Sequence, residues 1–191
     1  MRKFVLDTSI FVSSQAYVVF GSNPQQAFNN FLDIISTLKN VKFFMPPSVK
    51  EELFKFIDEK KCSNKHLKFI EYLPPSKYEI KIPGSLLYLL IEDLRLRINK
   101  GLRIAEKSVR GVGRGDKEEE IIKRLRQEYR VALREGIIDS IQDVDLLLLS
   151  YQLKATLVSE DKGLLEWSRK LGIESFNTQD LYKFLGEMKE C

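Results

Sequence analysis

The sequence of 191 residues is poor in the side chains that bind soft metals, with one histidine and two cysteines. Cys62 and Cys191 lie far apart and lack the paired spacing of zinc ligands, so we expect free thiols in a reducing cytoplasm. We interpret the single histidine, His66, as an ordinary surface or packing residue. Chemistry that depends on clustered cysteine or histidine is therefore not expected.

Long apolar runs are also missing. No stretch of about eighteen uncharged apolar residues occurs, so we expect no membrane-spanning helix. Asp7 interrupts the apolar stretch that follows the N-terminal Met-Arg-Lys and leaves it too short for a signal peptide. The segment GVGRG at 111–115 lies between two predicted helices rather than after a strand, which makes it a turn and excludes a P-loop.

Charge is distributed unevenly along the chain. The formal net charge is +4, but residues 95–134 hold thirteen Lys or Arg against six acids, a net +7. The rest of the chain holds 18 basic and 21 acidic residues, a net −3. An acidic body with one basic segment is the asymmetry expected of a protein that binds a polyanion.

Strand and helix patterns alternate along most of the chain, which predicts an α/β protein with a parallel sheet flanked by helices. The predicted strands cover 3–6, 41–45, 155–159 and 173–176. The predicted helices cover 24–39, 49–60, 140–153, 163–171 and 178–188. Ser48, with Glu51 three residues on, predicts the N-cap of the second of these helices. We expect 61–85 to be irregular, with at most a short helix near 67–72.

An inserted basic helical hairpin is predicted between the two α/β parts. Apolar residues repeat at helical spacing over 85–110, and a second helix is expected over 117–135. We therefore divide the chain into residues 1–84, 85–135 and 136–191. The basic side chains that we expect to bind RNA phosphates are Arg126, Arg130, Lys123, Arg134, Arg103, Lys107 and Arg110. The apolar face between Leu87 and Val109 is larger than two helices need to bury, so we also expect a subunit interface there.

Several carboxylates are predicted to meet at one edge of the sheet. Asp7 and Asp161 each follow a buried strand, and ligands of parallel sheets bind outside the carboxyl ends of the strands. Asp139 and Asp143 stand four residues apart and share a face if both are helical. Asp145 points roughly opposite Asp143 on an ideal helix. Taken alone, Asp7 is better explained as a helix cap. Asp139 could also be an N-cap, Asp143 or Asp145 a solvated residue on a helix face, and Asp161 a turn acid. Their joint placement favours a metal site.

A carboxylate cluster of this kind is typical of Mg²⁺ or Mn²⁺ sites, because these cations take oxygen ligands and offset the repulsion between the acids. Such a site next to a basic face indicates metal-assisted phosphodiester hydrolysis.

Four segments together resemble a PIN domain. They are FVLDTSIF (4–11), SVKEEL (48–53), DSIQDVDLLLLSYQL (139–153) and TLVSEDKGL (156–164). With the inserted basic hairpin, the chain is similar from end to end to the minimal protein-only ribonuclease P family, homologs of Aquifex ribonuclease P, also called RNA ligase partner proteins. The resemblance implies removal of the 5′ leader from precursor tRNA with Mg²⁺ or Mn²⁺. It also implies a cytoplasmic homo-oligomer built from dimers, a dodecamer in this family.

The resemblance also assigns roles to individual acids. It implies that Asp7, Asp139, Asp143 and Asp161 are the catalytic metal ligands, with Asp145 and Glu52 as auxiliary acids. Two other readings stay open at this point: a toxin-type PIN ribonuclease that cuts mRNA or mature tRNA, and a non-catalytic RNA-binding PIN scaffold. A phosphatase of the haloacid dehalogenase type is disfavoured, because Ser9 stands where that family needs a second Asp.

Overall fold

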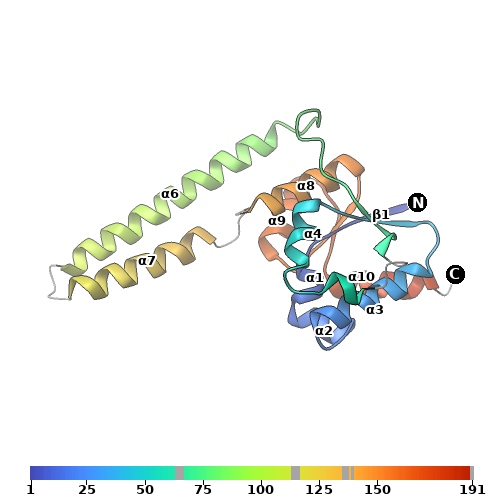
Figure 1. Cartoon of the computed structure of the whole chain (residues 1–191). Coiled ribbons are helices and arrows are strands. Elements are labelled where there is room, and N and C mark those ends of the chain that lie inside the picture. The colour runs from blue at the N-terminus through green and yellow to red at the C-terminus, as the bar shows by residue number, and fades with distance from the viewer. Residues whose placement is uncertain (63–66, 113–116, 135–137, 139, 190–191) are drawn as a thin grey trace. The chain divides into compact units, whose positions relative to one another are not determined.

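The computed structural model describes residues 1–62, 67–112, 117–134, 138 and 140–189. The chain divides into two compact units (Figure 1). Unit 1 comprises Met1–Ile80 and Ser140–Cys191, and unit 2 comprises Lys81–Asp139. No helix among the described residues is long and apolar enough to cross a membrane.

Unit 1 contains a five-stranded sheet in the order β3-β2-β1-β4-β5, in which every neighbouring pair is parallel. The strands are β1 (Arg2–Leu6), β2 (Val41–Met45), β3 (Ile70–Tyr72), β4 (Thr156–Val158) and β5 (Ser175–Phe176). β1 is central, and Val5 lies opposite both Phe44 and Leu157. The predicted α/β fold with a parallel sheet is therefore confirmed.

Two groups of helices flank the sheet (Figure 1). One group consists of α1 (Ser9–Val12), α2 (Ser14–Val19), α3 (Pro24–Ser36) and α10 (Thr178–Lys189). The other consists of α4 (Pro47–Leu53), α8 (Ile141–Leu153) and α9 (Lys162–Lys170). A 3-10 turn, η1 (Glu59–Lys61), follows α4. Because helices cover both faces of the sheet, the central strands carry apolar side chains on both sides.

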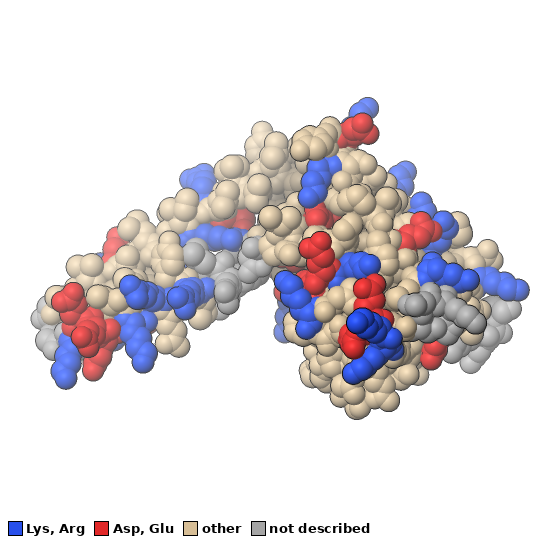
Figure 2. Space-filling view, in the orientation of Figure 1, with Lys and Arg blue, Asp and Glu red and all other residues tan. Residues whose placement is uncertain are grey.

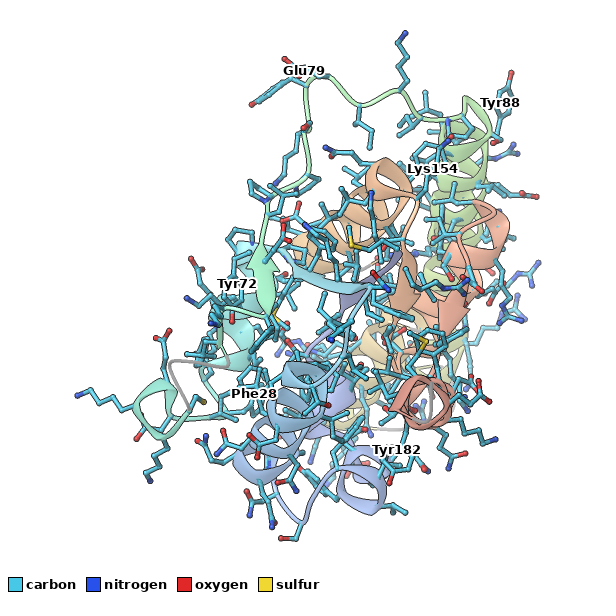
Figure 3. The ribbon with its side chains drawn as sticks, turned by 90° about the vertical axis from the view of Figure 1, so that its right-hand side faces the viewer. Phe28, Tyr72, Glu79, Tyr88, Lys154 and Tyr182 are labelled. Carbon is cyan, nitrogen blue, oxygen red and sulfur yellow. The ribbon has the colours of Figure 1, made fainter. Side chains whose placement is uncertain are left out.

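Aromatic side chains form much of the core of unit 1. The ring of Phe4 on β1 stacks on that of Phe43 at a centroid distance of 5.6 Å, and both side chains are buried. Phe11 meets the edge of Phe28, labelled in Figure 3, at 5.0 Å. Such pairs contribute roughly 1 kcal/mol each beyond the area they bury. This packing holds β1 rigidly, and the chain leaves its carboxyl end at Asp7.

Three local predictions were wrong. The segment expected to be irregular or helical contains β3, a three-residue edge strand whose Ile70 pairs with Phe43. The helix expected over 49–60 is shorter, because α4 ends at Leu53. Ser48 does not cap this helix, because α4 already begins at Pro47, with Pro46 as its N-cap residue. Proline is favoured in the first turn, since its missing N–H would have no partner there.

Unit 2 is a hairpin of two helices, α6 (Ser85–Val112) and α7 (Glu118–Arg134), which pack on one another. Small residues on α6 allow the close approach. A Cβ added at Gly101 would lie 2.7 Å from Cε2 of Tyr129, and Ser108 is buried with its hydroxyl bonded to its own helix at Ile104 O. Ile121 of α7 is also buried. On the α6 side the seam therefore depends on small residues, against which larger side chains of α7 pack.

The large apolar side chains of α6 stay exposed beside this seam. Ile98 is 68% exposed and Leu102 is 57% exposed. The other members of this apolar stripe are Leu87, Ile91 and Val109, all more than half exposed. Contiguous apolar surface of this kind marks an interaction site.

Candidate active site

Asp7 lies at the point where β1 and β4 end together. Its backbone N–H donates to Val158 O over 3.0 Å, so the two strands run side by side up to this residue. Its side chain is 9% exposed. The turn after β4 carries Asp161, two residues beyond Ser159. The predicted edge of the sheet thus carries both strand-end acids.

Two serine hydroxyls hold the Asp7 carboxylate. Ser9 Oγ and Ser159 Oγ both donate to Asp7 Oδ2, over 2.5 and 2.6 Å. The same hydroxyls accept backbone N–H groups from the next turn: Glu160 N–H donates to Ser9 over 2.9 Å, and Asp161 N–H donates to Ser159 over 2.9 Å. This serine clamp ties the turn that carries Asp161 to the carboxylate of Asp7. Hydrogen bonds to a charged acceptor contribute roughly 1.5–3 kcal/mol each.

Asp7 and Glu52 of α4 act on each other electrostatically. Burial raises the pKa of Asp7, and hydrogen bonds from Ser159 and Ser9 offset part of that rise. Burial also raises the pKa of Glu52, and the negative charge of Asp7 raises it further. Thr8 lies between the two elements, with its hydroxyl 3.3 Å from Val49 O and 3.5 Å from Glu52 Oε2. The predicted auxiliary acid Glu52 therefore faces Asp7.

Asp161 is the N-cap residue of α9. Its Oδ1 accepts the backbone N–H of Leu164 over 2.8 Å, so this residue caps a helix, a role that the sequence did not predict for it. Asp161 is itself exposed, and no described residue donates a hydrogen bond to its Oδ2. One oxygen thus fixes the side chain, while the other has no hydrogen-bond donor among the described residues.

Asp143 lies in the first turn of α8, and its side chain is half-buried. The N-cap of α8 is Ser140, whose Oγ accepts the backbone N–H of Asp143 over 3.0 Å. Asp139 lies outside the described residues. No group of three or more His, Cys, Asp or Glu side chains suited to a metal ion is found in the part of the chain that the structure describes.

Asp145 is buried against α4 and the segment that follows β3. It is 5% exposed, Ser48 Oγ donates to its Oδ2 over 2.7 Å, and Lys77 Nζ lies 2.9 Å from its Oδ1. Both oxygens therefore have partners, from α4 and from the segment after β3. The auxiliary role at the metal stays a prediction for Asp145.

The acids at the sheet edge have the chemistry of a hard-cation site. Their donors are carboxylate oxygens, which Mg²⁺ and Mn²⁺ prefer. The charge of Asp7 is buried and raises the pKa of the neighbouring Glu52, and a bound divalent cation would offset this unfavourable charge. The residues present thus fit such an ion, with Asp7 fixed in orientation before it binds.

One face of α7 presents basic side chains (Figure 2). Lys123, Arg126 and Arg130 are exposed and line one shallow hollow on this helix. No described residue forms an ion pair with these three. Lys107 on α6 differs, because its Nζ lies 3.2 Å from Glu128 of α7. Arg103 and Arg110 are exposed on α6, and the side chain of Arg134 lies outside the described residues.

Known proteins match this chain along nearly its whole length. A family described as PINc domain ribonuclease matches residues 3–190. The chain is 47% identical over 184 residues to the RNA-free ribonuclease P of Thermodesulfovibrio yellowstonii. This match covers 96% of this chain and 93% of the relative. The chain belongs to the RNA-free ribonuclease P family. The relative from Thermococcus kodakarensis is 47% identical, and the match covers 90% of this chain and 88% of the relative. The relative from Pyrococcus horikoshii is 43% identical, and the match covers 100% of this chain and 94% of the relative.

Membership of the RNA-free ribonuclease P family confirms the predicted PIN fold and the prediction of an endoribonuclease. PIN ribonucleases are generally dependent on divalent metals, in agreement with the oxygen donors at the sheet edge. Sequence reasoning did not assign a role to Ser9. The signal available was its position two residues after Asp7, in the turn that leaves the strand.

Proposed function

We propose that this member of the RNA-free ribonuclease P family removes the 5′ leader from precursor tRNA in the cytoplasm and leaves a 5′-phosphate on the mature tRNA. The observation that carries the proposal is the serine-clamped Asp7 at the sheet edge, joined in one chain to a basic hairpin. Asp7, Asp139, Asp143 and Asp161 would hold Mg²⁺ or Mn²⁺, with Glu52 next to Asp7 as an auxiliary acid.

A bound divalent cation supplies an activated water and neutralises charge on the scissile phosphate. The chain's own part is to orient the ligands. Ser9 and Ser159 keep Oδ2 of Asp7 in place, so this carboxylate would hold the ion from a fixed position. The cap contact to Leu164 does the same for Asp161. Ligands fixed in advance lose little conformational freedom when the substrate arrives.

The hairpin supplies the affinity for RNA in this proposal. Lys123, Arg126 and Arg130 lie on one face of α7, so they can follow successive phosphates without reading bases. That mode suits a folded RNA, which is recognised by its shape.

A cleavage assay tests the proposed function. Purified protein with Mg²⁺ is expected to cut a 5′-labelled precursor tRNA once, at the leader junction, and to give a product with a 5′-phosphate. Cutting within an anticodon loop or in mRNA would support a toxin-type nuclease instead. Binding of the RNA without any cut would support a non-catalytic scaffold.

We also propose that the protein assembles into a homo-oligomer built from dimers, up to a dodecamer, through the apolar stripe of α6. Replacing Ile98 and Leu102 by Glu places two charges on this stripe, at positions where Glu keeps the helix. We expect light scattering after gel filtration to give a smaller mass for this variant. A Val18→Glu control on α2, where the side chain is 80% exposed, should keep the wild-type mass. An equal mass for both variants would contradict the proposal.

A further inference from the structure

The segment that connects β3 to unit 2, residues 73–80, is held to unit 1 by a set of polar contacts; we call it the strap. Figure 3 shows it running from Tyr72 to Glu79. We propose that Lys77, Asp145 and Ser48 are positioning residues that fix the point from which the RNA-binding hairpin leaves the catalytic unit. This inference rests on the proposed function, in which the hairpin and the acids act on one RNA.

The first contact is the buried ion pair between the strap and α8. Lys77 Nζ lies 2.9 Å from Oδ1 of Asp145, while Ser48 Oγ donates to Oδ2 over 2.7 Å. The side chain of Asp145 is only 7% exposed, whereas that of Lys77 is 49% exposed. A carboxylate buried to this extent is destabilising unless its charge is compensated. The free energy of this pairing therefore favours the strap in its place on α8.

The second contact lies two helical turns further along α8. The backbone N–H of Ser76 donates to Gln152 Oε1 over 2.8 Å, and Gln152 Nε2 donates to Ser76 Oγ over 3.0 Å. Asp145 and Gln152 are seven residues apart, so they share one face of the helix about 10 Å apart along its axis. Two adjacent strap residues are thus bound to the same face of α8.

Apolar packing contributes little to holding the strap. Pro75 is buried, but Ser76, Lys77, Tyr78 and Glu79 are all exposed. The backbone N–H groups of Glu79 and Ile80 both donate to Ser76 O, which folds the strap into a tight turn around the residue that Gln152 holds. With so few apolar contacts, the position of the strap depends on its polar contacts to α8.

The chain returns from unit 2 to the same helix. Unit 2 ends at Asp139, and Ser140 is the N-cap residue of α8. Both covalent connections of the hairpin are therefore anchored on α8, the outgoing one through Lys77 and Ser76 and the returning one through Ser140. α8 also carries Asp143. The helix that bears a proposed metal ligand thus sets both attachment points of the hairpin.

A double-mutant cycle with precursor tRNA tests this role. We expect Lys77→Met to raise the KM about tenfold and to change kcat less than about twofold, because the hairpin then presents the RNA in more orientations. Asp145→Asn should raise the KM by a similar factor, and the KM of the double variant should be no higher than that of either single one. Lys77→Arg, which keeps the charge, should restore most of the affinity. Lys81→Met, which removes the same charge from an exposed neighbour, should behave as wild type.

Hydrogen exchange gives a readout that does not depend on RNA. The amides of Ser76, Glu79 and Ile80 should exchange faster in Lys77→Met than in wild type or in Lys81→Met, while those of β1 keep their protection. Unchanged exchange in the strap would overturn the inference. So would loss of kcat in Asp145→Asn with wild-type kinetics in Lys77→Met, which would place Asp145 at the metal. A wild-type protein that leaves precursor tRNA uncut would refute the proposed function alone, since the exchange result stands without it.

Discussion

Replacing Asp7 by Asn is expected to slow cleavage of precursor tRNA by about a thousandfold or more, which corresponds to about 4 kcal/mol of transition-state stabilisation. Asn keeps the shape of the side chain and can still accept hydrogen bonds from Ser9 and Ser159, so the turn that carries Asp161 should stay in place. What is lost is the negative charge that binds the divalent ion. Single-turnover cleavage rates and Mn²⁺ binding by calorimetry measure the two effects separately.

The same substitution should not weaken the fold when metal is absent. Burial raises the pKa of Asp7 above 3.8, so the folded chain keeps its proton at pH values where the unfolded chain has lost it. Stability therefore falls as the pH rises from about 3.8 through the folded pKa, and the loss is complete above that pKa. Asn removes this loss. In EDTA at pH 7 the melting temperature of Asp7→Asn should equal or exceed that of wild type, and the difference should shrink toward pH 4.

The matched control for Asp7→Asn is Asp33→Asn, an exposed position on α3. This control also removes one negative charge, but from a helix that carries none of the sheet-edge acids. The variant should cleave precursor tRNA and bind metal as the wild type does. A melting temperature in EDTA that is several degrees lower for Asp7→Asn would mean that the substitution disturbs packing. Full cleavage by Asp7→Asn would contradict the catalytic assignment outright.

The double substitution Arg126→Ala with Arg130→Ala is expected to weaken tRNA binding roughly thirtyfold, on the basis of about 1 kcal/mol for each lost phosphate contact. Counterion release makes binding depend on salt, and each lost contact lowers the slope of log K against log salt by about 0.7–0.9. The magnitude of the slope should therefore fall by about 1.4–1.8. Filter binding or fluorescence anisotropy across a salt series measures both quantities. The rate of the chemical step at saturating protein should change much less.

A control for general electrostatic attraction is Lys60→Ala with Lys61→Ala on η1, which removes the same charge from unit 1. If binding depended only on net charge, the two double variants would lose equal affinity. We expect the η1 pair to have a small effect and to keep the wild-type salt slope. An unchanged slope in the Arg126 and Arg130 variant would contradict the assignment of this face to RNA.

Much of the fold follows from local sequence signals. The apolar run before Asp7 predicts a buried strand that ends at a carboxylate, and the structure confirms both. The proline pair after Met45 ends β2, and the long apolar repeat predicts α6. β3 was missed because three residues, Ile-Glu-Tyr, are too few to show an alternating pattern, and its pairing with β2 provides the missing information.

The partners of the site residues were harder to predict, because they come from distant parts of the chain. The hundred-degree rule indicated that Asp145 points away from Asp143, but nothing local identifies Ser48, 97 residues earlier, as its partner. Ser48 itself was interpreted as a helix cap, although its hydroxyl is used in this long-range contact. Ser159 lies in the segment TLVSEDKGL that resembles a PIN domain, but nothing local predicts its bond to Asp7, which spans 152 residues.

The central place of β1 has a consequence for synthesis. The first strand to leave the ribosome needs β4 as a neighbour, and β4 begins at Thr156, so the middle of the sheet cannot close until four-fifths of the chain exists. At about 5–20 residues per second, translation adds the 152 residues between Asp7 and Ser159 in roughly 8–30 s. Only in the last part of that interval, after Arg134 has been added, does the nascent polypeptide contain both helices of the basic hairpin while β4 is still being made. On the proposed function, each newly made molecule would then be able to hold RNA before it is able to cut it.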